Sequence, residues 1–192
     1  LKRGAYDAIG DPVSRETPAS LSPFSPDWPR DRLGLAYWVT DPKNPLTARV
    51  TVNRWWQSIF GQGLVATPED FGSQGQLPSH PELLDWLARD FIESGWDVKA
   101  AWRRIVTSAT YRQASEGSPD LIAHDPDNVL LGRGPRHRLS AEMIRDLALA
   151  TSGLLAGRLE GPPVKPFQPA GLWEEKSGKP YERDVGEGSH RR

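Results

Sequence analysis

The chain has 192 residues, of which 37% are hydrophobic and 26% are charged, a composition that fits one globular domain with or without long arms. Its net charge of −1 excludes a global electrostatic field that would draw the chain onto nucleic acid or anionic lipid. The absence of cysteine excludes disulfides, thiolate metal sites and covalent c-type haem attachment in this segment, and no apolar run approaches the roughly 20 residues that span a bilayer.

The first 29 residues hold five prolines, which fix the backbone torsion φ and remove hydrogen-bond donors. We therefore expect residues 1–29 to form an extended N-terminal arm rather than a helix or a central strand. Leu21, Phe24 and Trp28 are the side chains expected to fasten this arm to the core.

The helical core is predicted between residues 30 and 157, because hydrophobic side chains recur there at helical spacing. Leu33 and Tyr37 mark the expected buried side of the first helix, and Val52 and Trp55 that of the second. The predicted helices cover 30–40, 45–60, 80–94, 98–109 and 141–156, with a single helical turn at 120–123.

Polar residues in front of these helices predict where they begin. Asn44 and Asp97 are expected N-caps, and Ser79 with Glu82 has the spacing of a capping box. Ser140 is expected to cap the last helix, whose inner face would include Ile144 and Leu147. The sequence thus predicts a mainly α fold, an irregular bundle of four to five helices with long Pro/Gly-rich arms, of which residues 158–192 form the C-terminal one.

Several long motifs resemble a known family. They are NPLTARVTVNRWWQSIFGQGLVATPEDFG from residue 44, PSHPELLDWLARDFIESGW from 78, TSATYRQAS from 107 and RLSAEMIRDLALATSG from 138. Together they resemble a planctomycete-specific domain of unknown function, found at the C-terminal side of large exported proteins that often carry cytochrome c-type domains.

The resemblance implies a bacterial protein that is exported to the periplasm or the cell surface. Its implied partners are other domains of the same polypeptide, and haem would be held in such a separate domain. Because the family domain usually continues past Arg192, the resemblance also implies that the C-terminal arm is a fragment of a larger domain. The resemblance supplies no catalytic residues.

The chain contains eight tryptophans, for which there are two interpretations. Aromatic faces could stack on sugar rings, or the indoles could pack in the core, where aromatic side chains bury a large area. Helical spacing with leucine and isoleucine favours packing. Trp38 and Trp173 lie off the main stripes and are expected at the surface.

Glu142 and Asp146 are the candidate catalytic residues. They stand four residues apart, on one face of a predicted helix, and could divide acid and base roles if burial separated their pKa values. The neighbouring Arg138 and Arg145 favour a structural ion-pair network instead.

Five polar residues are candidates for an interior or binding position. Their preferred role is to hold loops down through paired charges, and the alternative is a site for an anionic ligand or partner. These residues are Asn53, Arg54, Arg112, Arg138 and Arg145.

No metal or cofactor site is predicted in this segment. The stretch from Asp125 to Asn128 has some features of a calcium loop, but Val129 stands where an oxygen ligand would be needed, so a turn and helix cap is preferred. The basic residues of the helix at 98–109 are expected to form a solvated face rather than a nucleic-acid site.

Two functions follow as hypotheses. The first is a non-catalytic binding or scaffolding module that positions redox or substrate domains of an exported multidomain protein. The second is a hydrolase or carbohydrate-binding domain acting on polysaccharide. An enzyme needs Glu142 and Asp146 in an open cleft, whereas a scaffold would neutralise them against arginines.

Overall fold

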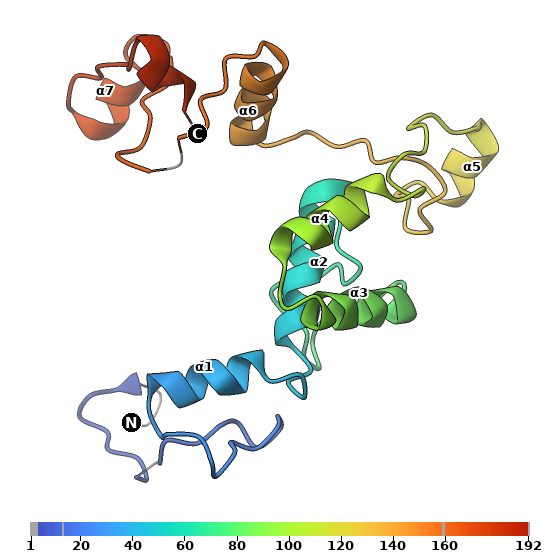
Figure 1. Cartoon of the computed structure of the whole chain (residues 1–192), viewed down its shortest axis with the longest axis vertical. Coiled ribbons are helices and arrows are strands. Elements are labelled where there is room, and N and C mark those ends of the chain that lie inside the picture. The colour runs from blue at the N-terminus through green and yellow to red at the C-terminus, as the bar shows by residue number, and fades with distance from the viewer. Residues whose placement is uncertain (1–3, 13, 159, 192) are drawn as a thin grey trace. The chain divides into compact units, whose positions relative to one another are not determined.

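The computed structural model describes residues 4–12, 14–158 and 160–191, so the outermost residues of both expected arms lie outside the described part. All regular elements within these ranges are helical, which confirms a mainly α fold, and none of the helices there has the length and apolar character to cross a membrane. The elements, shown in Figure 1, are α1 (Arg32–Thr40), α2 (Thr47–Phe60), α3 (Pro81–Glu93), α4 (Val98–Thr107), α5 (Pro119–His124), α6 (Ala141–Thr151), α7 (Leu172–Ser177) and a 3-10 turn at Gly186–His190.

The chain forms two compact units, Leu1–His137 and Arg138–Arg192. Helix α6 belongs to the second unit because Arg145 donates to the backbone carbonyls of Ser189 and Arg191. On the predicted inner face of α6, Ile144 and Leu147 are 47% and 55% exposed, contrary to the expectation that this face is buried.

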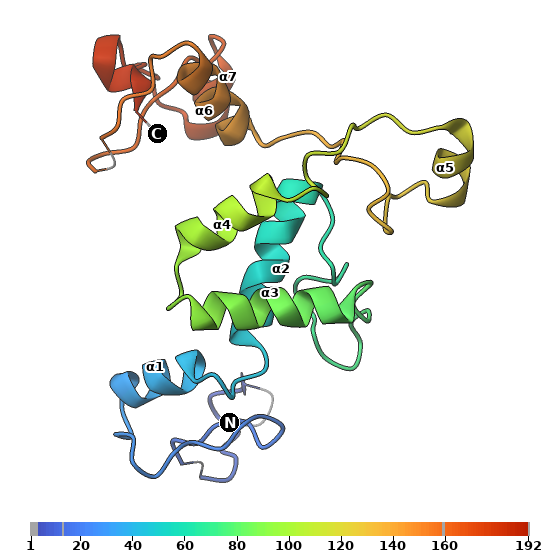
Figure 2. The same cartoon turned by 45° about the vertical axis from the view of Figure 1, so that its right-hand side comes forward.

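The core of the first unit lies between α2, α3 and α4, which pack together in both views (Figures 1 and 2). Each helix contributes side chains three or four positions apart, as amphipathic helices do when they share one core. The buried hydrophobic residues of these helices are Ala48, Val52, Trp56, Ile59, Leu84, Leu87, Ala88, Phe91, Ala101 and Ile105.

Tryptophans pack around this core as predicted, with one exception. Trp56 is buried, and Trp55 and Trp96 meet the ring of Phe91 edge-on at centroid distances of 4.8 and 5.0 Å. Trp86 is 52% exposed, and the guanidinium of Arg104 lies 5.6 Å from its ring centroid. Such a partly solvated cation–π contact stabilises modestly, so Trp86 belongs to the surface.

Three of the predicted caps are present, including Ser140, whose hydroxyl accepts from the backbone N–H of Met143 at 3.2 Å at the start of α6. The Asp97 carboxylate accepts from the backbone N–H of Ala100 at 3.0 Å. The Asn44 side chain accepts from the N–H groups of Leu46 and Thr47, although regular helix begins at Thr47, later than expected. All three side chains supply acceptors for N–H groups that a helix start leaves unpaired.

The capping box predicted at Ser79 and Glu82 is wrong. Helix α3 begins at Pro81, and the residue before it makes no side-chain capping bond. The hydroxyl of Ser79 donates instead to the carbonyl of Leu64, which also accepts from the Ser79 backbone N–H at 2.8 Å. Ser79 thus closes the loop between α2 and α3.

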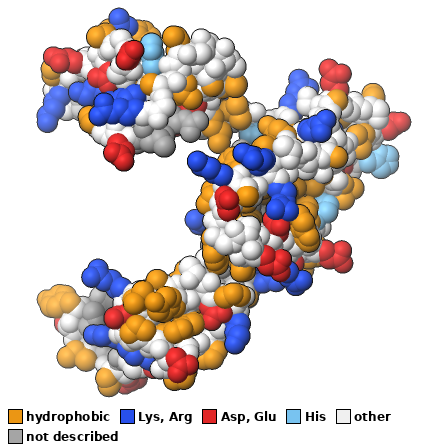
Figure 3. Space-filling view, in the orientation of Figure 1, with side chains coloured by type: hydrophobic (Ala, Val, Ile, Leu, Met, Phe, Trp, Pro, Cys, Tyr) orange, Lys and Arg blue, Asp and Glu red, His pale blue; other side chains and the backbone are white. Residues whose placement is uncertain are grey.

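Helix α1 buries a different face from the predicted one, about 100° further round the helix. Leu33 and Tyr37 are 53% and 46% exposed, and hydrophobic side chains gather on the surface over α1 (Figure 3). The buried face contains Gly34, where a Cβ atom would lie 1.9 Å from the carbonyl oxygen of Pro29 and 2.7 Å from the ring of Phe24. The preceding segment packs so closely on this face that only glycine fits there.

Trp38 is buried, which overturns its expected exposure. Its indole N–H donates to the carbonyl of Ser22 at 2.8 Å, and its own carbonyl accepts from the Asn44 side chain. Phe24 and Trp28 meet edge-on at 5.6 Å in the same segment, and the Trp28 ring lies 6.3 Å from the ring of Tyr37 on α1. Aromatic contacts and this indole bond therefore fasten the N-terminal segment to α1, as expected for Phe24 and Trp28.

Asn53 links α2 to the loop that follows it. Its side chain is 0% exposed; Nδ2 donates to the carbonyl of Val65 at 3.0 Å, and Oδ1 accepts from the Val65 N–H at 2.8 Å. A Cβ atom at Gly63 would lie 2.7 Å from Nδ2, so glycine lets the loop approach. The pair holds Val65 and the neighbouring Leu64 in the core.

Replacing Asn53 by alanine should lower the free energy of unfolding by about 2–5 kcal/mol, because it leaves the buried backbone N–H and C=O groups of Val65 without hydrogen-bond partners. Chemical denaturation measures the loss. The exposed neighbour Arg54 is the matched control, and Arg54→Ala should stay within about 0.5 kcal/mol of the parent chain. Equal losses in both variants would contradict this role of Asn53.

A second prediction concerns the ion pair between α2 and α3. Arg49 Nε lies 2.6 Å from Asp85 Oδ1, and this hydrogen bond lowers the pKa of Asp85 below its ordinary 3.8. Because the folded pKa is the lower one, the pair stabilises above the unfolded pKa and its contribution is lost as pH falls through the folded value. Both side chains are partly exposed, so a contribution of about 0.2–1 kcal/mol is expected at neutral pH.

A double-mutant cycle with Arg49→Gln and Asp85→Asn checks this pair at pH 7 and at an acidic pH below the folded pKa of Asp85, where the carboxylate is protonated. The coupling should be present at pH 7 and vanish in acid. A coupling that stays constant across this range would refute the assignment.

Candidate functional site

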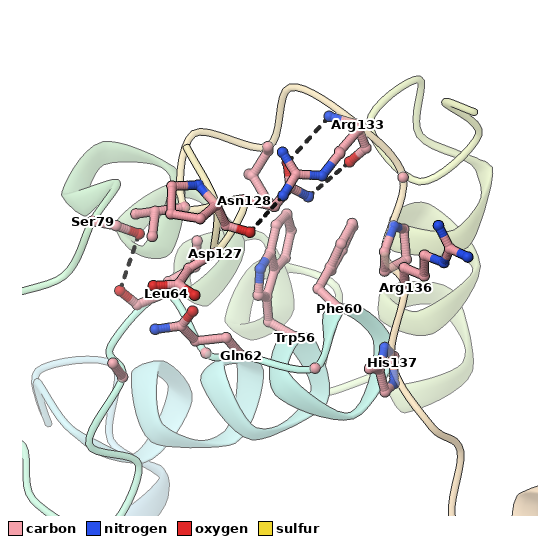
Figure 4. Close-up of a pocket in the computed structure, with 18 of the residues that line it drawn as sticks. Trp56, Phe60, Gln62, Leu64, Ser79, Asp127, Asn128, Arg133, Arg136 and His137 are labelled. Atoms are coloured by element: carbon pink, nitrogen blue, oxygen red, sulfur yellow. Dashed lines mark hydrogen bonds between the residues drawn. The ribbon is translucent and has the colours of Figure 1, made fainter. Parts of the chain in front are cut away.

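A hollow of about 520 Å³ lies at the C-terminal end of α2. One wall is the loop of residues 61–79, and the other is the segment of residues 126–137 that follows α5 (Figure 4). Its volume falls in the range of small-molecule sites. All of its lining residues belong to the first unit.

Aromatic rings form the base of the hollow. Trp56 and Phe60 stack with centroids 4.2 Å apart and planes at 21°, and Tyr111 meets Phe60 edge-on at 6.0 Å. Gly61 ends α2 with a φ of 88°, a left-handed conformation that favours glycine. A Cβ atom at Gly61 would also lie 3.0 Å from the Cβ atom of His137, so the two walls meet closely there.

Asp125 orders the loop after α5. The residue is 7% exposed. Its carboxylate accepts from the backbone N–H groups of Val129 and Leu130, each at 2.8 Å. Both carboxylate oxygens are therefore engaged by the backbone. This turn matches the preferred interpretation of the sequence, and the described residues include no group of three or more acidic or histidine side chains that could hold a metal ion.

Asn128 closes the same loop through a second pairing of side chain with backbone. Its Nδ2 donates to the carbonyl of Arg133 at 2.9 Å, and its Oδ1 accepts from the Arg133 N–H at 3.2 Å. The Arg133 guanidinium donates to the carbonyls of Asp125 and Pro126 at 2.8 and 2.7 Å (Figure 4). The loop is thus held from both ends before any ligand arrives.

Polar side chains surround the opening. Gln62 and Gln76 come from the first wall, and Asp127, Arg136 and His137 come from the second. All five are exposed. Within the ranges that the structure covers, no ion pair or hydrogen bond engages the side chain of Arg136 or His137.

The indole N–H of Trp56 opens into the hollow. The residue is only 5% exposed, and its N–H forms no hydrogen bond with any described residue. In the same part of the chain, no buried side-chain nitrogen or oxygen lacks a partner. The N–H group must therefore reach solvent, and Trp56 lines the hollow with its nitrogen edge toward Gln62 (Figure 4).

The five predicted binding residues do not line this hollow. Asn53 is buried and fastens the loop, whereas Arg54, Arg112 and Arg138 are exposed, contrary to the expectation of an interior position. Arg145 is half-buried and donates to carbonyl oxygens of the second unit. Ligand binding by these residues stays a prediction.

Glu142 and Asp146 lie together on α6, in the second unit. Hydrogen bonds from its own backbone N–H and from the Ser140 hydroxyl lower the pKa of the exposed Glu142 carboxyl. Asp146 lies 4.0 Å from Arg145. A general acid needs a raised pKa at neutral pH, so the environment of Glu142 fits the first turn of a helix better than acid catalysis.

The basic residues of α4 lie on the surface, with acidic side chains beside them (Figure 3). Arg104 pairs with Asp90 at 2.9 Å. This arrangement agrees with a solvated face.

Sequence reasoning did not identify the hollow. Its rim residues Gln62, Asp127 and Arg136 stand on two loops that are far apart in the chain, and no periodic pattern connects them. The usable signals were the glycines that end α2 and the polar turn at Asp125, which mark two tightly shaped loops.

The chain matches the model of a known family. The model of a family described as PSD1, protein of unknown function (DUF1553), matches residues 31–192, well over half of the chain. No curated protein and no solved structure matches the chain.

Asp125→Asn should lower the free energy of unfolding by about 1–3 kcal/mol, because an amide offers one acceptor where two backbone N–H groups need two. Thermal or chemical denaturation, with and without millimolar calcium, measures this change in stability. Asp127→Asn, at an exposed position two residues away, is the control and should change stability by less than about 0.5 kcal/mol. A calcium-dependent rise in Tm that Asp125→Asn abolishes would contradict the structural role.

Proposed function

The chain belongs to this family of proteins of unknown function, and we propose that it acts as a non-catalytic binding module within a larger polypeptide. The hollow at the end of α2 is its ligand site. The proposal depends on one observation: the solvent-accessible indole N–H of the otherwise buried Trp56, without a partner among the described residues, opens into a hollow whose walls are already ordered.

The composition of the hollow supports binding rather than catalysis. Its lining contains one carboxylate, that of Asp127, together with Arg133, Arg136 and His137. Hydrolysis by an acid and base pair of carboxylates needs two such groups across the substrate. A single exposed acid beside basic side chains can orient a ligand through hydrogen bonds and charge.

The wider setting is part of the same proposal. The motif resemblance supports an exported, planctomycete-type protein in which this segment holds neighbouring domains in place, including cytochrome c-type domains that carry haem. The position of the module at the periplasm or cell surface follows from the same resemblance. Its macromolecular partners would then be other domains of its own polypeptide.

The alternative is a hydrolase acting on polysaccharide through Glu142 and Asp146. The lowered pKa of Glu142 argues against its use as a general acid, since the group stays ionised at neutral pH. This alternative therefore depends on the spacing of two carboxylates along α6.

A thermal-shift screen of the full-length protein against glycans and haem should give a saturable rise in Tm with at least one ligand. At a ligand concentration about 100 times Kd, binding adds about 2.7 kcal/mol to the stability of the folded state. The Glu142→Ala/Asp146→Ala variant should keep this shift and bind with unchanged affinity.

Product release from a polysaccharide that this double variant abolishes would overturn the proposal in favour of the hydrolase. A screen without any saturable shift would remove the ligand-binding function.

A further inference from the structure

The hollow at the end of α2 offers more hydrogen-bond donors than acceptors. The Trp56 indole N–H is a donor only, and so is every group of a guanidinium. Arg133 directs two of its nitrogens to backbone carbonyls, and Arg136 retains its full set because it is exposed and makes no ion pair within the described ranges. A ligand rich in acceptor oxygens would complement this lining.

The charges favour an anion of low charge. Arg133 and Arg136 stand against the single carboxylate of Asp127 in the lining, and Arg133 also lies next to the buried Asp125. A planar carboxylate suits the fork of an arginine, which can bind it through two parallel N–H bonds. The carboxylate of Asp127 on the same rim would repel a doubly charged phosphate more strongly than a singly charged group.

The neutral polar groups point to hydroxyls as the other ligand feature. Gln62 and Gln76 each carry one amide oxygen and one NH₂ group, so either can serve a hydroxyl as donor or acceptor. Asp127 accepts from hydroxyls as well. The Trp56 ring itself cannot stack on a sugar face, because Phe60 already stacks on it with a centroid distance of 4.2 Å and only 5% of the residue is exposed.

We propose, on the premise that the hollow is a binding site, that its ligand is an acidic sugar: a uronate residue, alone or at the end of a short saccharide. The indole N–H of Trp56 binds a ring or hydroxyl oxygen, Arg136 binds the carboxylate, and Gln62 with Asp127 binds hydroxyl groups. A volume of about 520 Å³ accommodates a ligand of this size.

The test is a ¹H–¹⁵N NMR titration of the full chain with digalacturonate. Eight indole N–H cross-peaks are expected, one for each tryptophan. The cross-peak that disappears in the Trp56→Phe variant belongs to Trp56. This cross-peak should shift saturably, whereas those of the exposed Trp86 and Trp173 should stay in place.

Arg136→Gln should weaken binding by about tenfold or more, the effect of losing one charge-assisted contact. Arg103→Gln, which removes an exposed charge from α4 outside the hollow, is the matched control and should leave the affinity unchanged. The neutral galactose disaccharide should bind at least about tenfold more weakly than digalacturonate, because it cannot engage Arg136 as a carboxylate does.

Equal affinity for the neutral and the acidic disaccharide would overturn the acidic-sugar assignment and leave the binding module intact. If the thermal screen finds a saturable ligand but the Trp56 cross-peak does not move, the hollow is not the ligand site, while the chain is still a binding module. Inorganic phosphate that binds more tightly than digalacturonate would also overturn the assignment.

Discussion

The amide side chain of Asn53 is the constraint on which the rest of the first unit depends. It is completely buried and forms two hydrogen bonds with the backbone of Val65, so the loop after α2 has to return to the helix that it leaves. That return buries Leu64 and Val65 and shapes one wall of the hollow. Asn128 does the same on the other wall, where it forms two bonds with the backbone of Arg133.

Both walls are therefore ordered by the protein's own hydrogen bonds, which matters for binding. A flexible loop loses conformational entropy when a ligand orders it, and this loss weakens binding. A loop that is already ordered in the free protein avoids this loss. Side chains that take part in this ordering, such as Asp125, have their polar atoms engaged, while the indole N–H of Trp56 and the guanidinium of Arg136 do not. The distribution separates residues that build the hollow from residues that can meet a ligand.

Much of the fold could be predicted from the sequence because it depends on local rules. Helical spacing located α2, α3 and α4, and single residues such as Asp97 and Gly61 marked helix ends. The face of α1 could not be predicted, since it is decided by a proline-rich segment that packs on Gly34. The hollow was missed for a similar reason: its walls are two loops far apart in the chain, and one of them is held by the tertiary pair of hydrogen bonds between Asn53 and Val65. The sequence indicated an interior position for Asn53 but not its partner.

The most direct test is amide hydrogen exchange of the Val65 N–H, followed by NMR in the full chain. If Asn53 fixes the loop as described, this amide should exchange only through large-scale unfolding, with an opening free energy close to that of the α2 core amides. Exchange at the rate of an unprotected loop would show that the loop opens independently of the core. The hollow would then not be preformed, and the account would fail.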